Sequence, residues 1–212
     1  MDEIFNHLAN IFILNGFSLF MIGSSSRDYL LNKEISDYDF VTDATPTEIE
    51  KFLNVDSTFK KFGVVKLKYM GKHIDIATLR MENDYIDNRH PSKITFVKDI
   101  FLDYKRRDFT INCIYIDYKY NVIDPTNMGV KDLKNKILRF IKPIEISITE
   151  DPLRILRAFR FKEQYNLTFV GNEEEILFKH KDLLNKINKQ KILEERSKYK
   201  KVGGKKYDEL FK

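Results

Sequence analysis

The first 130 or so residues mix the hydrophobic spacing of helices with that of strands. Residues 2–14 place apolar side chains at helical spacing, which predicts an amphipathic helix that ends near Gly16. Residues 17–22 and 35–41 are strand-like runs, separated by the small residues 23–26 and a short apolar turn at 29–31. Residues 63–70 and 73–79 flank Gly71-Lys72 and predict a β-hairpin.

Between and after these runs the pattern is less regular. Thr45-Pro46-Thr47-Glu48 is a capping box, and we expect its helix to reach about residue 53. Residues 81–92 are polar and indicate a long loop, followed by a short strand at 94–97. Residues 113–116 are apolar, and residues 131–140 predict a short helix and strand that join one lobe to the next.

The remainder of the chain has helical spacing. Thr149 can cap a helix whose first turn holds Glu150 and Asp151, and further helices are expected over 172–191 and 192–201, with a break at Gly203-Gly204. We therefore expect an α/β (α+β) domain with a small mixed sheet over residues 1–140, and a helical region over 141–212.

Composition narrows the class of protein. The 212 residues are 42% hydrophobic and 33% charged, with no apolar run of membrane-spanning length and no expected signal peptide. The single cysteine, Cys113, cannot form an internal disulfide and favours a reducing cytoplasm. No Cys/His cluster suggests zinc.

Positive charge is concentrated at the C-terminal end. Residues 179–212 hold 12 Lys/Arg against 5 Asp/Glu, a net of +7, whereas the whole chain carries +5. A basic stretch favours a polyanionic partner such as RNA. A Lys-rich solvated helix is the alternative.

Three aspartates are candidates for chemistry. Asp37 and Asp39 alternate with Tyr38 and Phe40 along a predicted strand, so the two carboxylates share one face. They repel each other unless a cation lies between them, and Mg²⁺ prefers such oxygen ligands. The small residues 23–26 offer backbone N–H groups to phosphates, which together suggests metal-assisted nucleotidyl transfer, although a solvated strand end is the plain alternative.

A third carboxylate stands in the predicted hairpin. If Ile74 and Ile76 pack into the core, Asp75 faces the side of Asp37 and Asp39 and could complete the site. A surface aspartate on a hairpin fits the pattern equally well.

One predicted helix carries charge on a single arc. At about 100° per residue, Asp151, Arg154, Arg157 and Arg160 lie on one side and apolar residues on the other. A carboxylate and a guanidinium on a rigid face can pair with the edge of a base, and further arginines can neutralise phosphate. A salt-bridged surface helix is the alternative.

Seven stretches in this order and spacing resemble one family. They are Gly-Ser-Ser-Ser-Arg-Asp-Tyr-Leu-Leu (23–31), Asp-Tyr-Asp-Phe-Val-Thr (37–42), Ala-Thr-Pro (44–46), Asp-Ile-Ala-Thr-Leu-Arg (75–80), Arg-His-Pro (89–91), Arg-Arg-Asp-Phe-Thr-Ile-Asn (106–112) and Glu-Asp-Pro-Leu-Arg-Ile-Leu-Arg-Ala-Phe-Arg-Phe (150–161). Together they resemble the head and neck of class II CCA-adding tRNA nucleotidyltransferases and the related bacterial poly(A) polymerases. Both belong to the polymerase-β-like nucleotidyltransferase superfamily.

The resemblance implies a fold and roles. It implies a nucleotidyltransferase head over 1–140 and a helical neck over 141–212 that add CMP and AMP, from CTP and ATP, to a tRNA 3′ end with Mg²⁺. Asp37 and Asp39 would hold the metal ions, with Asp75 as a further catalytic carboxylate. The implied nucleotide-binding residues are Gly23, Ser24 and Arg27 at the triphosphate, Arg107, Asp108 and Asn112 at the nucleotide and its ribose, and Asp151, Arg154, Arg157 and Arg160 at the base and phosphates.

The chain also departs from this family. Ser24 stands where the family usually has a second glycine, and family members are longer, with domains that hold the tRNA. A separate RNA-binding partner chain or an oligomer could replace them. A poly(A) polymerase, an enzyme that adds only A or only C, and a degenerate nucleotide- or RNA-binding module without catalysis stay open as alternatives.

Overall fold

The computed structural model describes residues 2–85, 91–201 and 210, and for residues 83–93 no side chain is described. The chain divides into two compact units. Unit 1 comprises Met1–Glu82, Ile94–Arg107 and Ile111–Gly129, and unit 2 comprises Asn83–Lys93, Asp108–Thr110 and Val130–Lys212.

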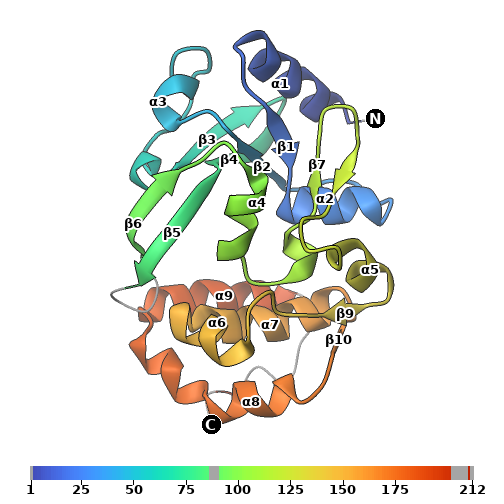
Figure 1. Cartoon of the computed structure of the whole chain (residues 1–212), viewed down its shortest axis with the longest axis vertical. Coiled ribbons are helices and arrows are strands. Elements are labelled where there is room, and N and C mark those ends of the chain that lie inside the picture. The colour runs from blue at the N-terminus through green and yellow to red at the C-terminus, as the bar shows by residue number, and fades with distance from the viewer. Residues whose placement is uncertain (1, 86–90, 202–209, 211–212) are drawn as a thin grey trace. The chain divides into compact units, whose positions relative to one another are not determined.

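Unit 1 is built on a six-stranded mixed sheet in the order β3-β4-β2-β1-β7-β8 (Figure 1). Strands β2 and β4 run parallel, and the other neighbours run antiparallel. The strands are β1 (Leu19–Met21), β2 (Tyr38–Thr42), β3 (Val64–Tyr69), β4 (Lys72–Thr78), β7 (Tyr115–Ile116) and β8 (Val122–Ile123). The expected small mixed sheet is confirmed.

The helices of unit 1 were predicted only in part: those at 3–14 and 46–49 were expected, with different ends, and those at 23–30 and 100–103 were not. The helices are α1 (Glu3–Leu14), α2 (Gly23–Leu30), α3 (Pro46–Ile49) and α4 (Ile100–Asp103), with 3₁₀ turns η1 (Lys60–Phe62) and η2 (Tyr104–Arg106), while η3 (Thr110–Asn112) spans the boundary between the units. The Asp2 carboxylate caps α1 by accepting from Phe5 N at 2.8 Å. The Thr45 capping box forms as predicted, but α3 ends at Ile49, not near residue 53.

The two faces of the unit 1 sheet bury different side chains. Tyr38 and Phe40 of β2 share a core with Ile74 and Ile76 of β4 and with the buried face of α1. On the opposite face Val41 belongs to a second, smaller cluster. Because strand side chains alternate, Asp39 and Asp75 lie on the same side as this smaller cluster.

The hairpin of β3 and β4 forms where Gly71-Lys72 predicted it. Met70 and Gly71 both have positive φ angles, of 48° and 77°. Such a pair of angles is typical of the tight turns that match the twist of antiparallel strands.

The predicted long loop over residues 81–92 is wrong. Strands β5 (Arg80–Tyr85) and β6 (Pro91–Phe96) pair as a two-stranded sheet, and β6 includes most of the predicted strand at 94–97. Apolar alternation is short in both strands: in sequence, Asn83 interrupts the face of Met81 and Tyr85, and only Ile94 and Phe96 alternate in β6, within the predicted strand. Arg89 and His90 of the Arg-His-Pro motif lie outside the described residues.

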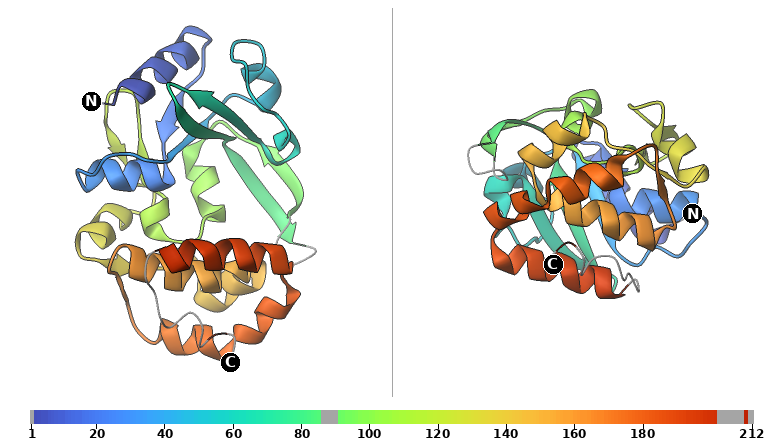
Figure 2. Two further views of the ribbon diagram at one scale, coloured as in Figure 1. Left: turned by 180° about the vertical axis from the view of Figure 1, so that it is seen from behind. Right: turned by 90° about the horizontal axis from the view of Figure 1, so that it is seen from below.

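Unit 2 is helical, and α9 lies alongside α7 (Figure 2). Its helices are α6 (Ile144–Glu150), α7 (Leu153–Gln164), α8 (Glu173–Lys179), the 3₁₀ segment η4 (Lys181–Lys186) and α9 (Lys189–Lys201). Helix α5 (Gly129–Lys134) belongs to unit 2 from Val130 onward. Strand β9 (Ile137–Leu138) pairs in parallel with β10 (Thr168–Phe169).

Two helix predictions in this unit are wrong. Thr149 does not cap α7, because it lies inside α6 and its hydroxyl donates to Glu145 O at 2.7 Å. Asp151 takes that place, since its Oδ1 accepts from Leu153 N at 3.1 Å. The helix expected over 172–191 is divided into α8 and η4, and α9 begins at Lys189.

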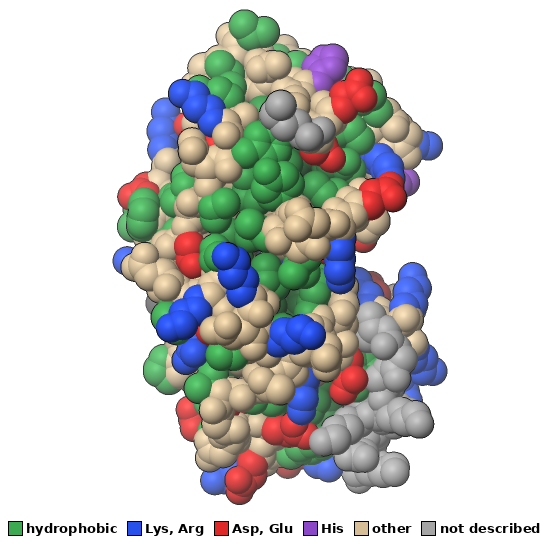
Figure 3. Space-filling view, turned by 90° about the vertical axis from the view of Figure 1, so that its right-hand side faces the viewer, with side chains coloured by type: hydrophobic (Ala, Val, Ile, Leu, Met, Phe, Trp, Pro, Cys, Tyr) green, Lys and Arg blue, Asp and Glu red, His purple; other side chains and the backbone are tan. Residues whose placement is uncertain are grey.

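Charge is dispersed over one face of the molecule (Figure 3). Figure 3 shows Lys and Arg side chains in several separate places on one face, with acidic and apolar side chains between them. Among the described residues, no helix has both the length and the apolar character that crossing a membrane requires.

Candidate active site

Helix α2 begins directly where β1 ends. The residues predicted as a small turn, 23–26, are its first turn, and Ile22 N donates to Asp39 O at 3.0 Å. Gly23 has a φ of +60°, and a Cβ there would lie 2.9 Å from Asp39 Oδ2. Only glycine therefore lets the start of α2 approach the Asp39 carboxylate this closely.

Two serines fasten this helix start to the segment that carries the aspartates. Ser24 donates from its backbone N (3.1 Å) and from its hydroxyl (2.6 Å) to Asp39 Oδ2. The Ser25 hydroxyl accepts from Asp39 N at 2.8 Å and donates to Asp37 O at 3.2 Å. The position of the Asp39 carboxylate is thus set from α2.

The three candidate carboxylates belong to two neighbouring strands or to the residue just before one of them. Asp39 of β2 and Asp75 of β4 are register partners in a parallel ladder, which points their side chains to the same face. Asp37 is exposed and stands one residue before β2 begins. Asp75 is also paired with Lys66, at 3.3 Å.

These residues fit a metal that needs few protein ligands. In the described part of the chain, no group of three or more His, Cys, Asp or Glu side chains gathers closely enough to hold a metal. Mg²⁺ is usually bound through one or two carboxylates, with water and substrate phosphates completing its shell. The oxygen donors of Asp37 and Asp39 suit such an ion.

Asp28 is a further acidic residue that interacts with Asp37 and Asp39 and is absent from the predicted site. Burial raises the pKa of its carboxyl; Arg27 and Lys33 oppose the shift, and Asp37 and Asp39 add to it. The charges of Asp37 and Asp39 therefore act on this position as a negative field.

Arg27 and Asn112, 85 positions apart in sequence, meet in unit 1. Arg27 is buried and its guanidinium donates to Asn112 Oδ1. The resemblance assigned both residues to nucleotide binding, and their contact fixes the direction of the Arg27 side chain.

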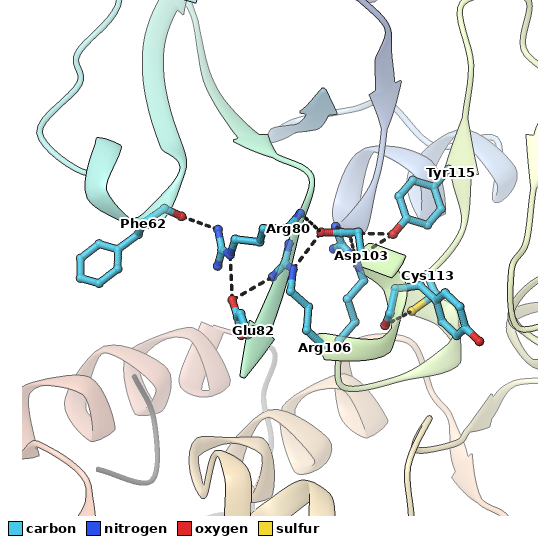
Figure 4. A network of polar contacts seen from close by, with 9 residues as sticks. Phe62, Arg80, Glu82, Asp103, Arg106, Cys113 and Tyr115 are labelled. Carbon is cyan, nitrogen blue, oxygen red and sulfur yellow. Dashed lines mark hydrogen bonds and ion pairs between the residues drawn. The ribbon is translucent and has the colours of Figure 1, made fainter. Parts of the chain in front are cut away.

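Arg107 belongs to a buried polar network centred on Asp103, a residue absent from the predicted site (Figure 4). The Asp103 side chain is fully buried and accepts from Arg80 N (3.1 Å), Arg106 Nε (2.8 Å), Arg107 Nη2 (2.7 Å) and the Tyr115 hydroxyl (2.7 Å). One carboxylate thereby joins the start of β5, the end of α4, η2 and β7.

Opposing effects set the pKa values in this network. Burial alone would raise the pKa of Asp103, but the adjacent guanidinium groups of Arg106 and Arg107 hold it well below its usual range. Burial would lower the pKa of Arg107, and the charge of Asp103 outweighs that effect and raises it. Both side chains are therefore charged at neutral pH.

The network extends to β5 through a second carboxylate. Glu82 Oε1 accepts from Arg80 Nε at 2.7 Å and lies 3.6 Å from Arg106 Nη1. Arg80 Nη1 also donates to Phe62 O at 2.5 Å (Figure 4). Two hints of this network stand in the sequence: Asp103 is an acid within the otherwise apolar run Phe101-Leu102-Asp103-Tyr104, and Arg106 and Arg107 follow it at i+3 and i+4.

In unit 2, Asp108 and Arg157 form an ion pair. Arg157 Nε donates to Asp108 Oδ2 at 2.7 Å, and Asp108 Oδ1 accepts from Phe109 N at 2.9 Å. Burial lowers the pKa of Arg157, and the charge of Asp108 outweighs it and raises the pKa. Asp108, predicted to contact the ribose, and Arg157, predicted to contact the base or phosphate, thus hold each other in place.

Arg154 points toward α6. Its Nη1 donates to Ser147 Oγ (3.0 Å), Ser147 O (3.2 Å) and Glu150 Oε2 (3.2 Å), and the residue is buried. Asp151 lies one turn before it and caps α7. The two predicted base-reading residues therefore stand at the same helix start, with Arg154 fixed by its neighbours.

Arg160 is bound to α9. Its Nε donates to Glu195, its Nη1 donates to Gln164 Oε1 at 2.9 Å, and its guanidinium lies 4.3 Å from the centre of the Phe161 ring. Glu195 is itself buried. This arginine ties two helices of unit 2 together.

The predicted site residues divide between the units. Unit 1 holds the metal and triphosphate candidates Gly23, Ser24, Arg27, Asp37, Asp39 and Asp75, together with the nucleotide candidates Arg107 and Asn112. Unit 2 holds Asp108, Asp151, Arg154, Arg157 and Arg160.

Known proteins share this sequence and fold. The profile of the poly A polymerase head domain matches residues 19–139. The chain is 39% identical over 181 residues to the CCA-adding enzyme of Lactobacillus helveticus, which covers 85% of this chain and 45% of that protein.

Solved structures give the same result. The Bacillus stearothermophilus CCA-adding enzyme in complex with CTP matches with a TM-score of 0.82 at 27% identity, over 94% of this chain and 49% of that one. A tRNA nucleotidyltransferase complexed with a primer tRNA and an incoming ATP analogue matches with a TM-score of 0.72 at 30% identity, over 92% of this chain and 58% of that one. The chain thus spans about half the length of the relatives it matches.

Proposed function

Because the chain belongs to the family of proteins with a poly A polymerase head domain, we propose that it adds CMP and AMP, from CTP and ATP, to the 3′ end of tRNA. The observation that carries this proposal is the in-register pair Asp39 and Asp75 on neighbouring strands, next to the start of α2. Relatives named CCA-adding enzymes and structures that hold CTP or a primer tRNA support the choice of substrates.

The family generally uses metal ions and nucleoside triphosphates, and we assign Mg²⁺ to this chain, held by Asp37 and Asp39. When bound, such an ion makes the RNA 3′-hydroxyl more acidic and neutralises charge on the triphosphate. Asp75 lies beside Asp39 and adds negative charge that favours a cation on this face. Gly23, Ser24 and Arg27 at the start of α2 are assigned to the triphosphate.

The remaining residues select the nucleotide. We assign Arg107 and Asn112 to the nucleotide and Asp108 to the ribose hydroxyls, with Arg157 holding the Asp108 carboxylate in place. Asp151 and Arg154 are assigned to the edge of the base, so no nucleic-acid template is needed. Arg160 is assigned a supporting role, because its hydrogen bond to Glu195 joins α7, which carries Arg154, to α9.

On this proposal residues 1–140 form the catalytic head and residues 141–212 a helical neck with a basic C-terminal stretch. The reaction is placed in the cytoplasm, as the single cysteine suggests. A separate RNA-binding partner chain or an oligomer would hold the tRNA body.

The test is a primer-extension assay with purified protein, Mg²⁺ and tRNA transcripts that end before, within and after the CCA triplet. Each nucleotide is supplied alone, and then CTP with ATP, and products are separated at single-nucleotide steps. Addition of two C and one A followed by a halt is expected. A long ladder of A would indicate a poly(A) polymerase instead, and a halt after one nucleotide type would indicate an enzyme that adds only that nucleotide. Nucleotide binding without any extension would indicate a binding module.

A further inference from the structure

We propose that the Ser24 hydroxyl competes with the divalent cation for Asp39 and so lowers the metal affinity of the free protein. The inference rests on the proposed function, because that function assigns the metal to Asp37 and Asp39. It concerns Ser24, which stands where the resembling family usually has a second glycine.

The argument begins with the hydrogen bonds that Asp39 already accepts. Both donors of Ser24 converge on one oxygen, Oδ2, with the backbone N at 3.1 Å and the hydroxyl at 2.6 Å. A carboxylate oxygen has about two lone-pair sites. Both sites of Oδ2 are therefore engaged by Ser24, so a cation that binds Asp39 through Oδ2, or through both carboxylate oxygens, must displace a donor.

The hydroxyl is the donor that can leave. The Ser24 N–H is fixed by the first turn of α2, whereas the hydroxyl hydrogen rotates about the Cβ–Oγ bond. The length of 2.6 Å is typical of an O–H group that donates to a charged carboxylate. Losing this bond opposes metal binding.

A second acceptor is already in place for the displaced proton. Ser24 Oγ lies 3.1 Å from Asp37 O as well as 2.6 Å from Asp39 Oδ2, and one hydroxyl hydrogen serves only one of them at a time. When a cation takes Oδ2, the hydroxyl can turn to Asp37 O without losing all hydrogen bonding. The cost is thus the difference between a charged and a neutral acceptor, which limits the effect to a moderate one.

The Asp39 carboxylate lies against the start of α2, where only the missing Cβ of Gly23 leaves room for it. Ser25 holds the backbone of the same segment by donating to Asp37 O and accepting from Asp39 N. The carboxylate is held against α2, and Ser24 is the neighbour whose side chain can change its bonding.

The experiment measures Mn²⁺ binding to the full chain without nucleotide, by the electron paramagnetic resonance signal of free Mn²⁺. Ser24→Ala removes the hydroxyl and keeps the backbone donor, and we expect it to bind Mn²⁺ about fivefold to tenfold more tightly, the factor given by one hydrogen bond. Ser26→Ala is the matched control, because the Ser26 hydroxyl donates within the helix to Gly23 O at 3.3 Å. Its affinity is expected to equal that of the wild type.

A further variant, Asp39→Asn, separates failure of this inference from failure of the proposed function. If Asp39→Asn weakens Mn²⁺ binding but Ser24→Ala binds as the wild type does, or more weakly, the competition is refuted and the metal assignment stands. If Asp39→Asn binds like the wild type, the metal does not use Asp39, and both the assignment and the inference fail.

Thermal unfolding gives a readout independent of the spectroscopic signal. A ligand stabilises the folded state in proportion to the logarithm of its concentration over Kd, so Mn²⁺ should raise the Tm of Ser24→Ala more than that of the wild type. Ser24→Gly, which also lacks the hydroxyl, should behave like Ser24→Ala. An equal Mn²⁺-induced rise in all three proteins would overturn the inference.

Discussion

Two charged regions of the molecule differ in their exposure to solvent. The open region holds the aspartates Asp37, Asp39 and Asp75, and the closed region holds Asp103 with Arg106 and Arg107. Lys66 and Asp75 form an ion pair whose side chains are 45% and 48% exposed, and Asp37 is exposed as well. The pair of Arg107 and Asp103 has exposed fractions of only 13% and 0%. One region is accessible to water and ions, and the other is closed.

This difference teaches which residues are free to exchange partners. Exposed ion pairs contribute little free energy, so ligands can replace their members at low cost. A buried carboxylate with several donors is costly to disturb, because removing one partner leaves the others unpaired. We infer that the open region exchanges ligands and that the closed region holds fixed geometry.

Removing a carboxylate from the open region should have the largest effect on chemistry. Asp37→Ala should lower nucleotide incorporation by about 1,000-fold, the rate equivalent of several kcal/mol of lost charge stabilisation. Because Asp37 is exposed, the Tm should stay near that of the wild type. Single-turnover incorporation with a thermal-unfolding control measures both. Unchanged incorporation would remove Asp37 from the metal site.

Removing the carboxylate of the closed region should act on stability instead. Asp103→Asn removes the carboxylate that pairs with Arg106 and Arg107, although Glu82 still lies 3.6 Å from Arg106, and it should lower the free energy of unfolding by about 3–5 kcal/mol. Chemical denaturation at pH 7 measures this change. A loss below about 1 kcal/mol, the range of exposed pairs, would break the comparison.

The same variant has a characteristic pH dependence. The pKa of Asp103 is lower in the folded protein than in the unfolded chain, so its stabilisation is complete above the unfolded pKa of about 4 and is lost as the pH falls further. The wild type should therefore lose stability faster than Asp103→Asn below that pH. Parallel curves for the two proteins would contradict the ionised state of Asp103.

Arg154 tests whether a fixed arginine reads the base. Arg154→Ala should reduce the preference for CTP and ATP over UTP and GTP by about 10- to 100-fold, the range of one bidentate base contact. Ser147→Ala, which removes a hydrogen-bond partner of Arg154, should reduce it less. Competition assays with all four nucleotides measure the preference. Unchanged selectivity in Arg154→Ala would refute its base-reading role.

The smallest effect is expected at the exposed pair. Lys66→Met should change the free energy of unfolding by less than about 0.5 kcal/mol, since exposed pairs are screened by water and salt. Its denaturation curve, measured beside that of Asp103→Asn, gives the contrast directly. A loss comparable to that of Asp103→Asn would show that exposure does not separate the two regions.

The sequence predicted the sheet well because its strands are amphipathic. The alternation around Phe40 and Ile76 is sufficient to place Asp39 and Asp75 on one face, and the register of β2 and β4 agrees. The hairpin at Gly71 and the capping box at Thr45 were also predicted, since both depend on local backbone chemistry.

Features that depend on tertiary contacts were missed. Residues 23–26 are small and lack helical periodicity, yet they form the first turn of α2. This turn is held by hydrogen bonds between Ser24 or Ser25 and Asp39 of β2, which the local sequence does not reveal.

Strands β5 and β6 each carry only two apolar residues that share a face, Met81 with Tyr85 and Ile94 with Phe96. The Arg160–Glu195 pair joins residues 35 positions apart. Asp103 is paired locally with Arg106 and Arg107, but its bonds to Arg80 and Tyr115 join distant positions. The assigned roles of the site residues stay predictions.

The central claim, that the open carboxylates carry nucleotidyl transfer, is tested most directly by single-turnover addition of CMP to a tRNA transcript that lacks CCA. The rate is measured for the purified chain with Mg²⁺, with the ion removed by a chelator, and with Mg²⁺ restored. The account predicts addition with Mg²⁺, loss on removal and recovery on restoration, with Asp37→Ala about 1,000-fold slower than the wild type when Mg²⁺ is present. Addition at the wild-type rate without a divalent ion, or in Asp37→Ala, would contradict it.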